Sequence, residues 1–260
     1  MIKDNLDIFI CAYKNFDKPV NNEVYKTLSV GNNNELYEEK IIRDDTDDNI
    51  SNMNGFFSEL SGMYWIWKNY DIKDYVGFCH YRRYFDFLDN IPEDINEYDI
   101  ILPKPLYFNL TIKQSYSIYH NAEDLELLKQ ILNTKYGISK DIINETFNQK
   151  YLYANNIFIM KKELFNEYCN IVFGVLFEYL KINNLKSIGH IKRMITSNSR
   201  KYLKNFYPNN TIEYQSRIGG FFAERILNIW LRTKPELKVK TRDLIITENK
   251  YNKINEKDFL

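Results

Sequence analysis

The densest group of side chains that could do chemistry is the segment His80-Tyr81-Arg82-Arg83. It directly follows residues 75–79, a short apolar run typical of a buried strand. Arginine presents a rigid fork of donors that matches phosphate oxygens, and a tyrosine ring offers a stacking surface. We therefore predict an anion-binding site after this strand. Structural ion pairs of the two arginines with nearby carboxylates are the alternative.

A second polar segment contains Asn49, Ser51 and Asn54 and leads into an aromatic pattern with helical spacing over residues 56–67. The first turn of a helix has backbone N–H groups without partners, which favour anions. We predict that these three side chains position an anionic group or the hydroxyls of a ligand.

Three carboxylates are candidates for general acid–base work. Glu224 lies among aromatic residues, where burial would raise its pKa and suit a general base, although an ion pair with Arg225 would serve only the helix. Asp86 and Asp124 are the other candidates. Arg217, seven residues before Glu224, adds a cation to the same region.

Three further polar residues stand close to predicted element ends. His120 lies four residues before Asp124 near the start of a predicted helix, a spacing that would place both on one face. Asn155 and Asn156 lead into an otherwise apolar strand. All three are candidates for binding polar groups of a ligand.

The elements that must position these residues follow from periodicity. Short apolar runs predict strands at residues 7–12, 75–79, 98–102 and 156–160, whereas residues 21–48 are interpreted as a polar loop. Helical spacing predicts helices at 56–67, 123–132, 162–180, 188–203 and 220–231, with Asn121 as a helix cap. Strands alternating with helices indicate an α/β fold with a mostly parallel sheet. In such folds ligands bind at strand carboxyl ends, which adds Tyr13 and Lys14 after the first strand.

Composition narrows the function further. The chain has 35 Lys and Arg and 35 Asp and Glu, so its formal net charge is zero, which argues against a nucleic-acid partner. No Pro- or Gly-rich linker is visible, so we predict a single domain over residues 1–260. Its core lies at about 7–232 and a polar C-terminal tail follows, with a possible edge strand at 243–247.

The three cysteines lie in apolar runs without metal-binding spacing, which indicates buried thiols in a reducing compartment. No signal peptide or membrane span is visible, and we expect a cytoplasmic protein. P-loop, dinucleotide-binding, Gly-x-Ser-x-Gly and HExxH motifs are also missing, which disfavours the enzyme classes that carry them.

Several of these segments together resemble the signature of a bacterial capsular and exopolysaccharide biosynthesis family long catalogued as a domain of unknown function. The resemblance is carried by Asn49-Ile-Ser, Asn54, Glu59-Leu60, Tyr64-Trp65-Ile-Trp67-Lys68-Asn69, Tyr75-Val-Gly77, His80-Tyr81-Arg82-Arg83-Tyr84-Phe85, Asn156-Ile-Phe-Ile-Met and Arg217-Ile-Gly-Gly-Phe-Phe-Ala-Glu224-Arg225. It covers about residues 7–232. One departure is that the first strand of the family usually ends in a His-Lys pair, where this chain has Tyr13-Lys14.

The resemblance implies a glycosyltransferase with a GT-A-like fold, which is a single α/β domain whose mostly parallel central sheet is flanked by helices. It implies transfer of a hexose, of galactose type in some members, from a nucleotide-sugar donor, with a UDP-sugar as the first expectation. The expected acceptor is a lipid-linked saccharide of a capsular, exopolysaccharide or O-antigen chain. The basic stretch of residues 186–204 would then lie on the cytoplasmic face of the inner membrane, or else form a solvated helix face.

The resemblance also suggests roles for the candidate residues. The donor and its diphosphate would be bound by Tyr13, Lys14, Asn49, Ser51, Asn54, His80, Tyr81, Arg82, Arg83 and Arg217. His120, Asn155 and Asn156 would bind the acceptor or a sugar. Glu224, with Asp86 and Asp124 as alternatives, would take the proton of the acceptor hydroxyl.

Many GT-A enzymes hold Mn²⁺ or Mg²⁺ with an Asp-x-Asp motif after a strand, and here His80-Tyr81-Arg82 would stand at that position. We therefore expect the arginines to stabilise the leaving diphosphate and no metal cofactor to be needed. Asp45-Thr-Asp47 matches the metal motif formally, within an Asp-rich loop that we interpret as solvated. A divalent metal remains the alternative.

Three other functions stay open at this point. A non-catalytic protein on the same fold would bind sugar nucleotides or polysaccharide without turnover. A nucleotidyltransferase would release pyrophosphate and need metal-binding carboxylates where residues 80–83 stand. A purely structural role is disfavoured by the polar, Arg- and Asn-rich strand ends.

Overall fold

The computed structural model describes residues 2–20, 22–31, 36, 41–204 and 210–247. Its centre is a mixed sheet with the order β10-β6-β9-β4-β1-β2-β3, and β5 and β11 extend it from β4. The strands of this sheet are β1 (Leu6–Ala12), β2 (Tyr25–Ser29), β3 (Ile42–Arg43), β4 (Tyr75–His80), β5 (Arg83–Phe85), β6 (Ile100–Pro103), β9 (Phe158–Lys161), β10 (Val239–Arg242) and β11 (Leu244–Ile246). A separate antiparallel pair is formed by β7 (Leu106–Tyr107) and β8 (Tyr151–Leu152).

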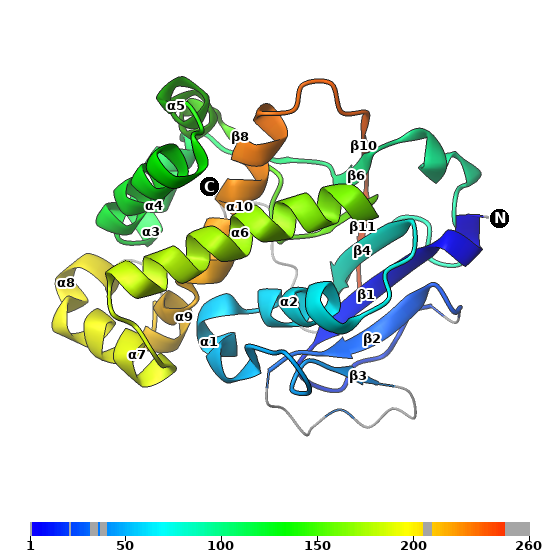
Figure 1. Cartoon of the computed structure of the whole chain (residues 1–260), viewed down its shortest axis with the longest axis horizontal. Coiled ribbons are helices and arrows are strands. Elements are labelled where there is room, and N and C mark those ends of the chain that lie inside the picture. The colour runs from blue at the N-terminus through cyan, green and yellow to red at the C-terminus, as the bar shows by residue number, and fades with distance from the viewer. Residues whose placement is uncertain (1, 21, 32–35, 37–40, 205–209, 248–260) are drawn as a thin grey trace.

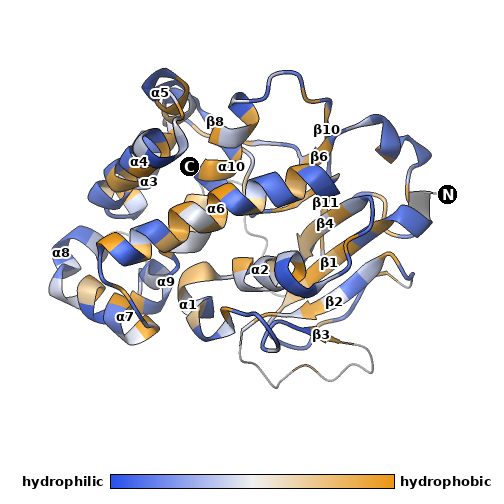
Figure 2. Cartoon of the chain, in the orientation of Figure 1, coloured by the Kyte–Doolittle hydropathy of each residue, from blue (hydrophilic) through white to orange (hydrophobic). Residues whose placement is uncertain are grey.

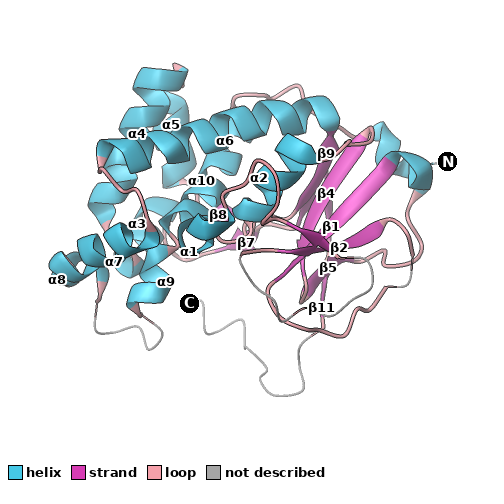
Figure 3. Ribbon diagram, turned by 60° about the horizontal axis from the view of Figure 1, so that its bottom comes forward, coloured by secondary structure: helices cyan, strands magenta, loops and turns pink. Residues whose placement is uncertain are grey.

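The helices cover the sheet and form a second body beside it (Figures 1 and 3). They are η1 (Ile2–Asn5), η2 (Ser51–Met53), α1 (Asn54–Phe57), α2 (Leu60–Asn69), η3 (Glu93–Glu97), α3 (Ile112–Tyr119), α4 (Ala122–Tyr136), α5 (Lys140–Asn148), α6 (Lys162–Ile182), α7 (Ile188–Ser197), α8 (Ser199–Tyr202), α9 (Ile212–Ser216) and α10 (Ile218–Arg232). The long helix α6 runs from the sheet to the group of α3, α4 and α7 (Figure 1). No helix in the described part of the chain has the length and apolar character needed to cross a bilayer.

The core lies on both faces of the sheet because strand side chains alternate between faces. Every residue of β1 is buried. Phe9 belongs to the cluster that includes Phe165 of α6, whereas Ile8 and Ile10 belong to the opposite cluster, with Tyr84 of β5. Hydrophobic residues accordingly follow β1 and β4 in Figure 2. A strand buried on both faces is held rigidly, which suits the support of a ligand site at its end.

Strand directions decide where polar groups meet. The strands β1, β2, β3 and β4 are parallel, so β1 and β4 end at the same edge of the sheet. Between β4 and β6 lies β9, which is antiparallel to both. The residues just before β9 therefore reach the same edge as the ends of β1 and β4.

These observations confirm the predicted α/β fold with a mostly parallel central sheet flanked by helices. One interpretation was wrong, because the predicted polar loop at residues 21–48 contains the buried strand β2. Its polar appearance comes partly from Lys26, whose Nζ lies 3.0 Å from Asp7 Oδ1 of β1. An ion pair of this kind, buried at Asp7 and partly exposed at Lys26, carries no apolar signal in the sequence.

The predicted polar tail also enters the sheet. The expected edge strand is present as β11, which pairs antiparallel with β5. In addition, β10 pairs in parallel with β6, aligning Val239 with Ile100. The folded body thus extends past residue 232, because main-chain hydrogen bonding to a sheet edge requires no apolar side chains.

Candidate active site

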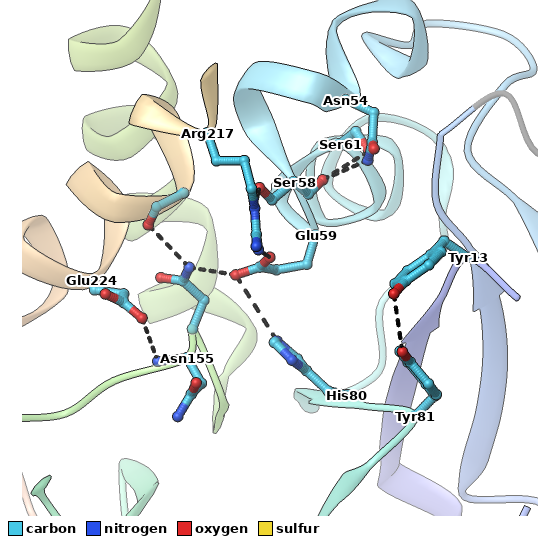
Figure 4. A network of polar contacts seen from close by, with 12 residues as sticks. Tyr13, Asn54, Ser58, Glu59, Ser61, His80, Tyr81, Asn155, Arg217 and Glu224 are labelled. Carbon is cyan, nitrogen blue, oxygen red and sulfur yellow. Dashed lines mark hydrogen bonds and ion pairs between the residues drawn. The ribbon is translucent and has the colours of Figure 1, made fainter. Parts of the chain in front are cut away.

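A cavity of about 680 Å³ lies at the sheet edge where β1 and β4 end. The junction of α1 and α2, the turn before β9 and the start of α10 form part of its wall (Figure 4), and residues of β7, β8, α3 and α9 also line it. The sequence-predicted residues that line it are Tyr13, Asn54, His80, Tyr81, Arg82, Arg83, His120, Asn155, Arg217 and Glu224. The structure therefore gathers candidates that lie far apart in the chain, from Tyr13 to Glu224.

Four arginines and three glutamates line the cavity, and Arg225 is paired with Glu224, so the positive charge comes mainly from Arg82, Arg83 and Arg217. Burial, and then the neighbouring charge of Arg82, lower the pKa of Arg83, which shows that its charge is costly in this position. The Nε of Arg217 donates a hydrogen bond to Ser58 Oγ at 2.9 Å, and its side chain remains 46% exposed. An anion in the cavity would offset the electrostatic cost of bringing these guanidinium groups together.

An aromatic pair forms the wall at the ends of β1 and β4. The hydroxyl of Tyr81 donates to that of Tyr13 at 3.2 Å, and the two rings meet edge to face at 5.5 Å (Figure 4). Arg82 lies over the Tyr81 ring at 4.9 Å, and Lys14 Nζ lies 5.6 Å from the same ring. Because Tyr13 is 49% exposed, its ring offers a surface on which a planar group can stack.

Glu224 presents a carboxylate to the cavity from the second turn of α10. Its Oε1 accepts the backbone N–H of Asn155 at 2.8 Å, and its Oε2 accepts Arg225 Nη1 at 2.6 Å. Burial raises the pKa of Glu224, and the positive charge of Arg225 opposes that shift. Arg217 lies two helical turns earlier, so it projects from the same face of α10.

Glu59 is a second carboxylate in the cavity wall, and we did not predict it as a site residue. Its side chain is 12% exposed, and its Oε1 accepts Asn156 Nδ2 at 2.6 Å. Its oxygens also lie 3.9 Å from His80 Nε2 and 3.9 Å from Arg217 Nη2 (Figure 4). The sequence carried one signal for it, because Glu59 is part of the segment on which the family resemblance rests.

A break between α1 and α2 presents Glu59. At Ser58 the backbone has φ 55° and ψ −134°, a conformation that only glycine adopts readily. Asn54 Nδ2 supports the break by donating to the Ser58 carbonyl at 2.7 Å and to Ser61 Oγ at 2.8 Å. The predicted continuous helix at residues 56–67 is therefore interrupted, and the interruption turns Glu59 into the cavity.

The turn before β9 is equally specialised. Asn155 and Asn156 both have positive φ, at 67° and 51°, which asparagine tolerates better than other residues with a side chain. In this turn the Asn155 N–H donates a hydrogen bond to Glu224, and the Asn156 side chain donates one to Glu59. Asn156 itself is 2% exposed and does not line the cavity.

His120 enters the cavity wall as a neutral ring. Burial lowers its pKa to about 3, and its Nδ1 lies 3.2 Å from Gln215 Oε1. His120 and Asp124 do not share a helix face, because α3 ends at Tyr119 and Asn121 caps a new helix, α4. The cap predicted at Asn121 is present, with its side chain accepting the Glu123 N–H at 3.2 Å.

The remaining candidates lie outside the cavity. Asp124 is buried in α4, where it accepts hydrogen bonds from Tyr179 at 2.8 Å and Tyr202 at 3.0 Å. Asp86 lines a separate depression of about 400 Å³ beside Arg242. Neither carboxylate is placed to meet a ligand in the main cavity.

Asn49 and Ser51 also face one another rather than the cavity. Asn49 Oδ1 accepts the Ser51 hydroxyl at 3.0 Å and the Ser51 N–H at 3.3 Å. This local turn orders the start of η2, just ahead of α1. Their placement supports the Glu59 segment without lining the site.

The acidic loop that we considered as an alternative metal site is paired with neighbouring side chains. Asp45 Oδ2 accepts a hydrogen bond from Arg43 Nη2 at 3.1 Å, and Asp48 Oδ1 accepts one from the Tyr64 hydroxyl at 3.1 Å. Among the described residues, no group of three or more His, Cys, Asp and Glu side chains is arranged to hold a metal ion. The three cysteines are buried and carry free thiols.

Fold and cavity place the molecule among the α/β proteins that bind ligands at the carboxyl ends of parallel strands. The chain belongs to the family described as a domain of unknown function, DUF4422, whose profile matches residues 7–197. This match confirms the resemblance to a family catalogued without a function. A search of curated proteins found no match.

Among solved structures, the chain is similar to the apo structure of WbbM, described as a bifunctional glycosyltransferase. The TM-score is 0.72 and the sequence identity is 25%. The similarity covers 94% of this chain but 46% of that one, so the chain spans less than half of that protein. The chain therefore has the fold of a large part of a glycosyltransferase structure.

Proposed function

We propose that this chain is a glycosyltransferase that transfers a hexose from a nucleotide-sugar donor to a saccharide acceptor. The observation that carries the proposal is the meeting of Arg82, Arg83 and Arg217 with the Glu224 carboxylate in one cavity. Similarity to a bifunctional glycosyltransferase over 94% of the chain supports it.

The cationic side of the cavity suits the diphosphate of the donor. Its phosphate oxygens would meet the forked guanidinium groups of Arg82, Arg83 and Arg217, and the exposed ring of Tyr13 would stack on the base. Lys14 beside Tyr81 adds positive charge near this end. We propose a UDP-sugar as donor.

In the transfer, the bond between the anomeric carbon and the diphosphate oxygen breaks, and the acceptor oxygen forms a new bond to that carbon. The acceptor proton passes to the Glu224 carboxylate, and the electron pair of the broken bond stays with the nucleoside diphosphate. Because burial raises the pKa of Glu224, its carboxylate is a better base than a solvated carboxylate. Fixed arginines stabilise the charge that develops on the leaving group, which supports a metal-independent reaction.

Another group of lining residues suits the acceptor. Leu106, Phe108, Tyr119 and Leu152 line the cavity, with His120 and Asn155 as polar groups. Apolar and aromatic side chains of this kind pack against the faces of sugar rings. We propose a lipid-linked capsular, exopolysaccharide or O-antigen saccharide as acceptor, used at the cytoplasmic face of the inner membrane.

A donor-hydrolysis screen tests the proposal. The protein is incubated with UDP-, GDP-, CMP- and dTDP-sugars, with EDTA or with added Mn²⁺, and released nucleotide is measured. We expect release from one donor, unchanged by EDTA and reduced at least about a hundredfold in Arg82→Ala. Arg193→Ala, which removes an exposed arginine of α7 outside the cavity, is the matched control.

Each other outcome has a distinct meaning. Nucleotide binding with neither release nor transfer to an acceptor would indicate the non-catalytic binding protein. Release that disappears with EDTA and returns with Mn²⁺ would show that a metal, and not the arginines alone, stabilises the leaving group. The absence of both binding and release with every donor would refute the proposed function.

A further inference from the structure

Glu59 has no role in the reaction as described so far, although several hydrogen bonds fix its position in the cavity wall. Three polar contacts around Ser58 and Asn54 hold the break that turns its side chain into the cavity. Asn156, from a turn almost one hundred residues away, then fixes Oε1 at 2.6 Å. A side chain held from both sides in this way has a defined position before any ligand arrives.

The groups around Glu59 are cationic or can become so. Arg217 Nη2 and His80 Nε2 each lie 3.9 Å from its carboxylate. His80 Nε2 is buried and makes no hydrogen bond to any other described residue. One carboxylate therefore faces two nitrogen groups that themselves face the cavity.

We propose that Glu59 is a positioning residue: its carboxylate is the counter-ion of Arg217 and faces the His80 ring, and it holds both side chains in the cavity until the diphosphate of the donor takes its place. The inference rests on the proposed function for the identity of that anion. The role differs from that of Glu224, whose oxygens are taken by Arg225 and the Asn155 N–H.

The electrostatics of His80 agree with this role. Burial lowers its pKa most, Glu59 raises it, and the positive charges of Arg83 and Arg217 lower it, while a backbone hydrogen bond with Asn155 raises it. Glu59 is the carboxylate among these groups. Removing the Glu59 charge should therefore lower the pKa of His80 further.

The substitution Glu59→Gln removes the negative charge of the side chain and keeps its shape. Glutamine keeps the volume and the oxygen that accepts Asn156, so the packing of the break is preserved. The chain has three histidines, so ¹⁵N–¹H NMR titration can follow each ring separately. His120, whose pKa is lowered by burial and not by Glu59, serves as an internal reference.

We expect the pKa of His80 to be lower in Glu59→Gln than in the wild type, with no change for His120. Glu145→Gln, which removes an exposed carboxylate of α5 from its ion pair with Arg232, should leave His80 unchanged. Glu59→Asp, which keeps the charge on a shorter side chain, should give an intermediate value and serves as the test if Glu59→Gln does not fold. An unchanged His80 titration in Glu59→Gln would overturn the inference.

Binding and turnover provide the second readout. With UDP as probe, loss of the competing negative charge should tighten binding by about threefold to tenfold, whereas turnover should fall about tenfold because Arg217 is no longer held. A parallel loss of UDP affinity and turnover would show that Glu59 only supports the fold and would overturn the inference. If the wild type neither binds UDP nor releases nucleotide, the proposed function fails, while the His80 titration still decides whether Glu59 acts on His80.

Discussion

At the level of single residues, the two cavity carboxylates are held by different partners. Glu224 is paired with Arg225 at 2.6 Å, which favours its ionised form, while burial raises its pKa. Glu59 is instead held by a neutral amide and lies near two nitrogen groups of the cavity. This contrast is why we assign proton transfer to Glu224 and positioning to Glu59.

Glu224→Gln tests the first assignment. Glutamine keeps the oxygen that accepts the Asn155 N–H but cannot take a proton from the acceptor. We expect turnover to fall by about 10² to 10⁴, while UDP affinity measured by calorimetry stays within about threefold. Glu145→Gln, which also separates a glutamate from an arginine, is the control. Turnover within tenfold of the wild type would remove Glu224 from the mechanism.

Residue types and strand-end positions were enough to find much of the cavity wall. His80, Arg82 and Arg83 were predicted because they directly follow a buried strand, whereas Arg217 was predicted from its place seven residues before Glu224. Asp124 was also predicted, but it is satisfied by two tyrosine hydroxyls away from the cavity. A sequence does not show whether a carboxylate already has partners inside the fold.

At the level of elements, the approach of α10 to α1 brings Arg217 to Ser58. A Cβ on Gly219 would lie 2.7 Å from the Phe56 ring and 2.9 Å from the Phe56 carbonyl oxygen. A Cβ on Gly220 would lie 3.1 Å from Ser58 Oγ. These glycines therefore serve the close packing of two helices that carry site residues.

Gly219→Ala should force α10 away from α1. We expect the free energy of unfolding to fall by about 1–3 kcal/mol or more, together with a loss of turnover as Arg217 shifts. Gly189→Ala is the matched control, since that helical glycine has Ser187 Oγ at 3.7 Å as its nearest neighbour. It should be neutral or stabilise by about 0.5–1 kcal/mol. Equal urea unfolding curves for the two variants would contradict the packing argument.

At the level of the whole molecule, two buried groups give opposite pH dependences. Burial lowers the pKa of His120 from 6.5 to about 3, so the unfolded chain binds the extra proton between these values and the free energy of unfolding falls as pH falls. Burial raises the pKa of Asp124 from 3.8 to about 6, so there the native protein binds the extra proton and its stability rises as pH falls from about 6 to 3.8.

Urea unfolding at a series of pH values separates the two groups. Asp124→Asn should make stability fall more steeply between pH 6 and 4, by on the order of 3 kcal/mol, because the compensating proton uptake is gone. His120→Asn, whose amide can replace the Nδ1 donor to Gln215, should make the protein more resistant to acid over the same range. Two variants with the pH profile of the wild type would show that neither group is titrating as its burial requires.

Local pattern alone determined the α/β class, the strands β1 and β4, the helices α6 and α10, and the cationic segment after β4. These features depend on side-chain periodicity and type within a few residues, which any stretch of sequence displays. The same locality explains the misses at β2, where Lys26 interrupts the apolar pattern to pair with Asp7, and at β10, which is held by main-chain pairing with β6.

Only the tertiary structure decided which polar groups meet. Arg217 reaches Ser58 across 159 residues of chain, and Asn156 reaches Glu59 across 97. These contacts depend on the antiparallel insertion of β9 and on the break at Ser58, which are fixed by packing and hydrogen bonds between distant segments. Because such contacts form only when the chain closes on itself, no local pattern of residues could reveal the carboxylate that faces His80.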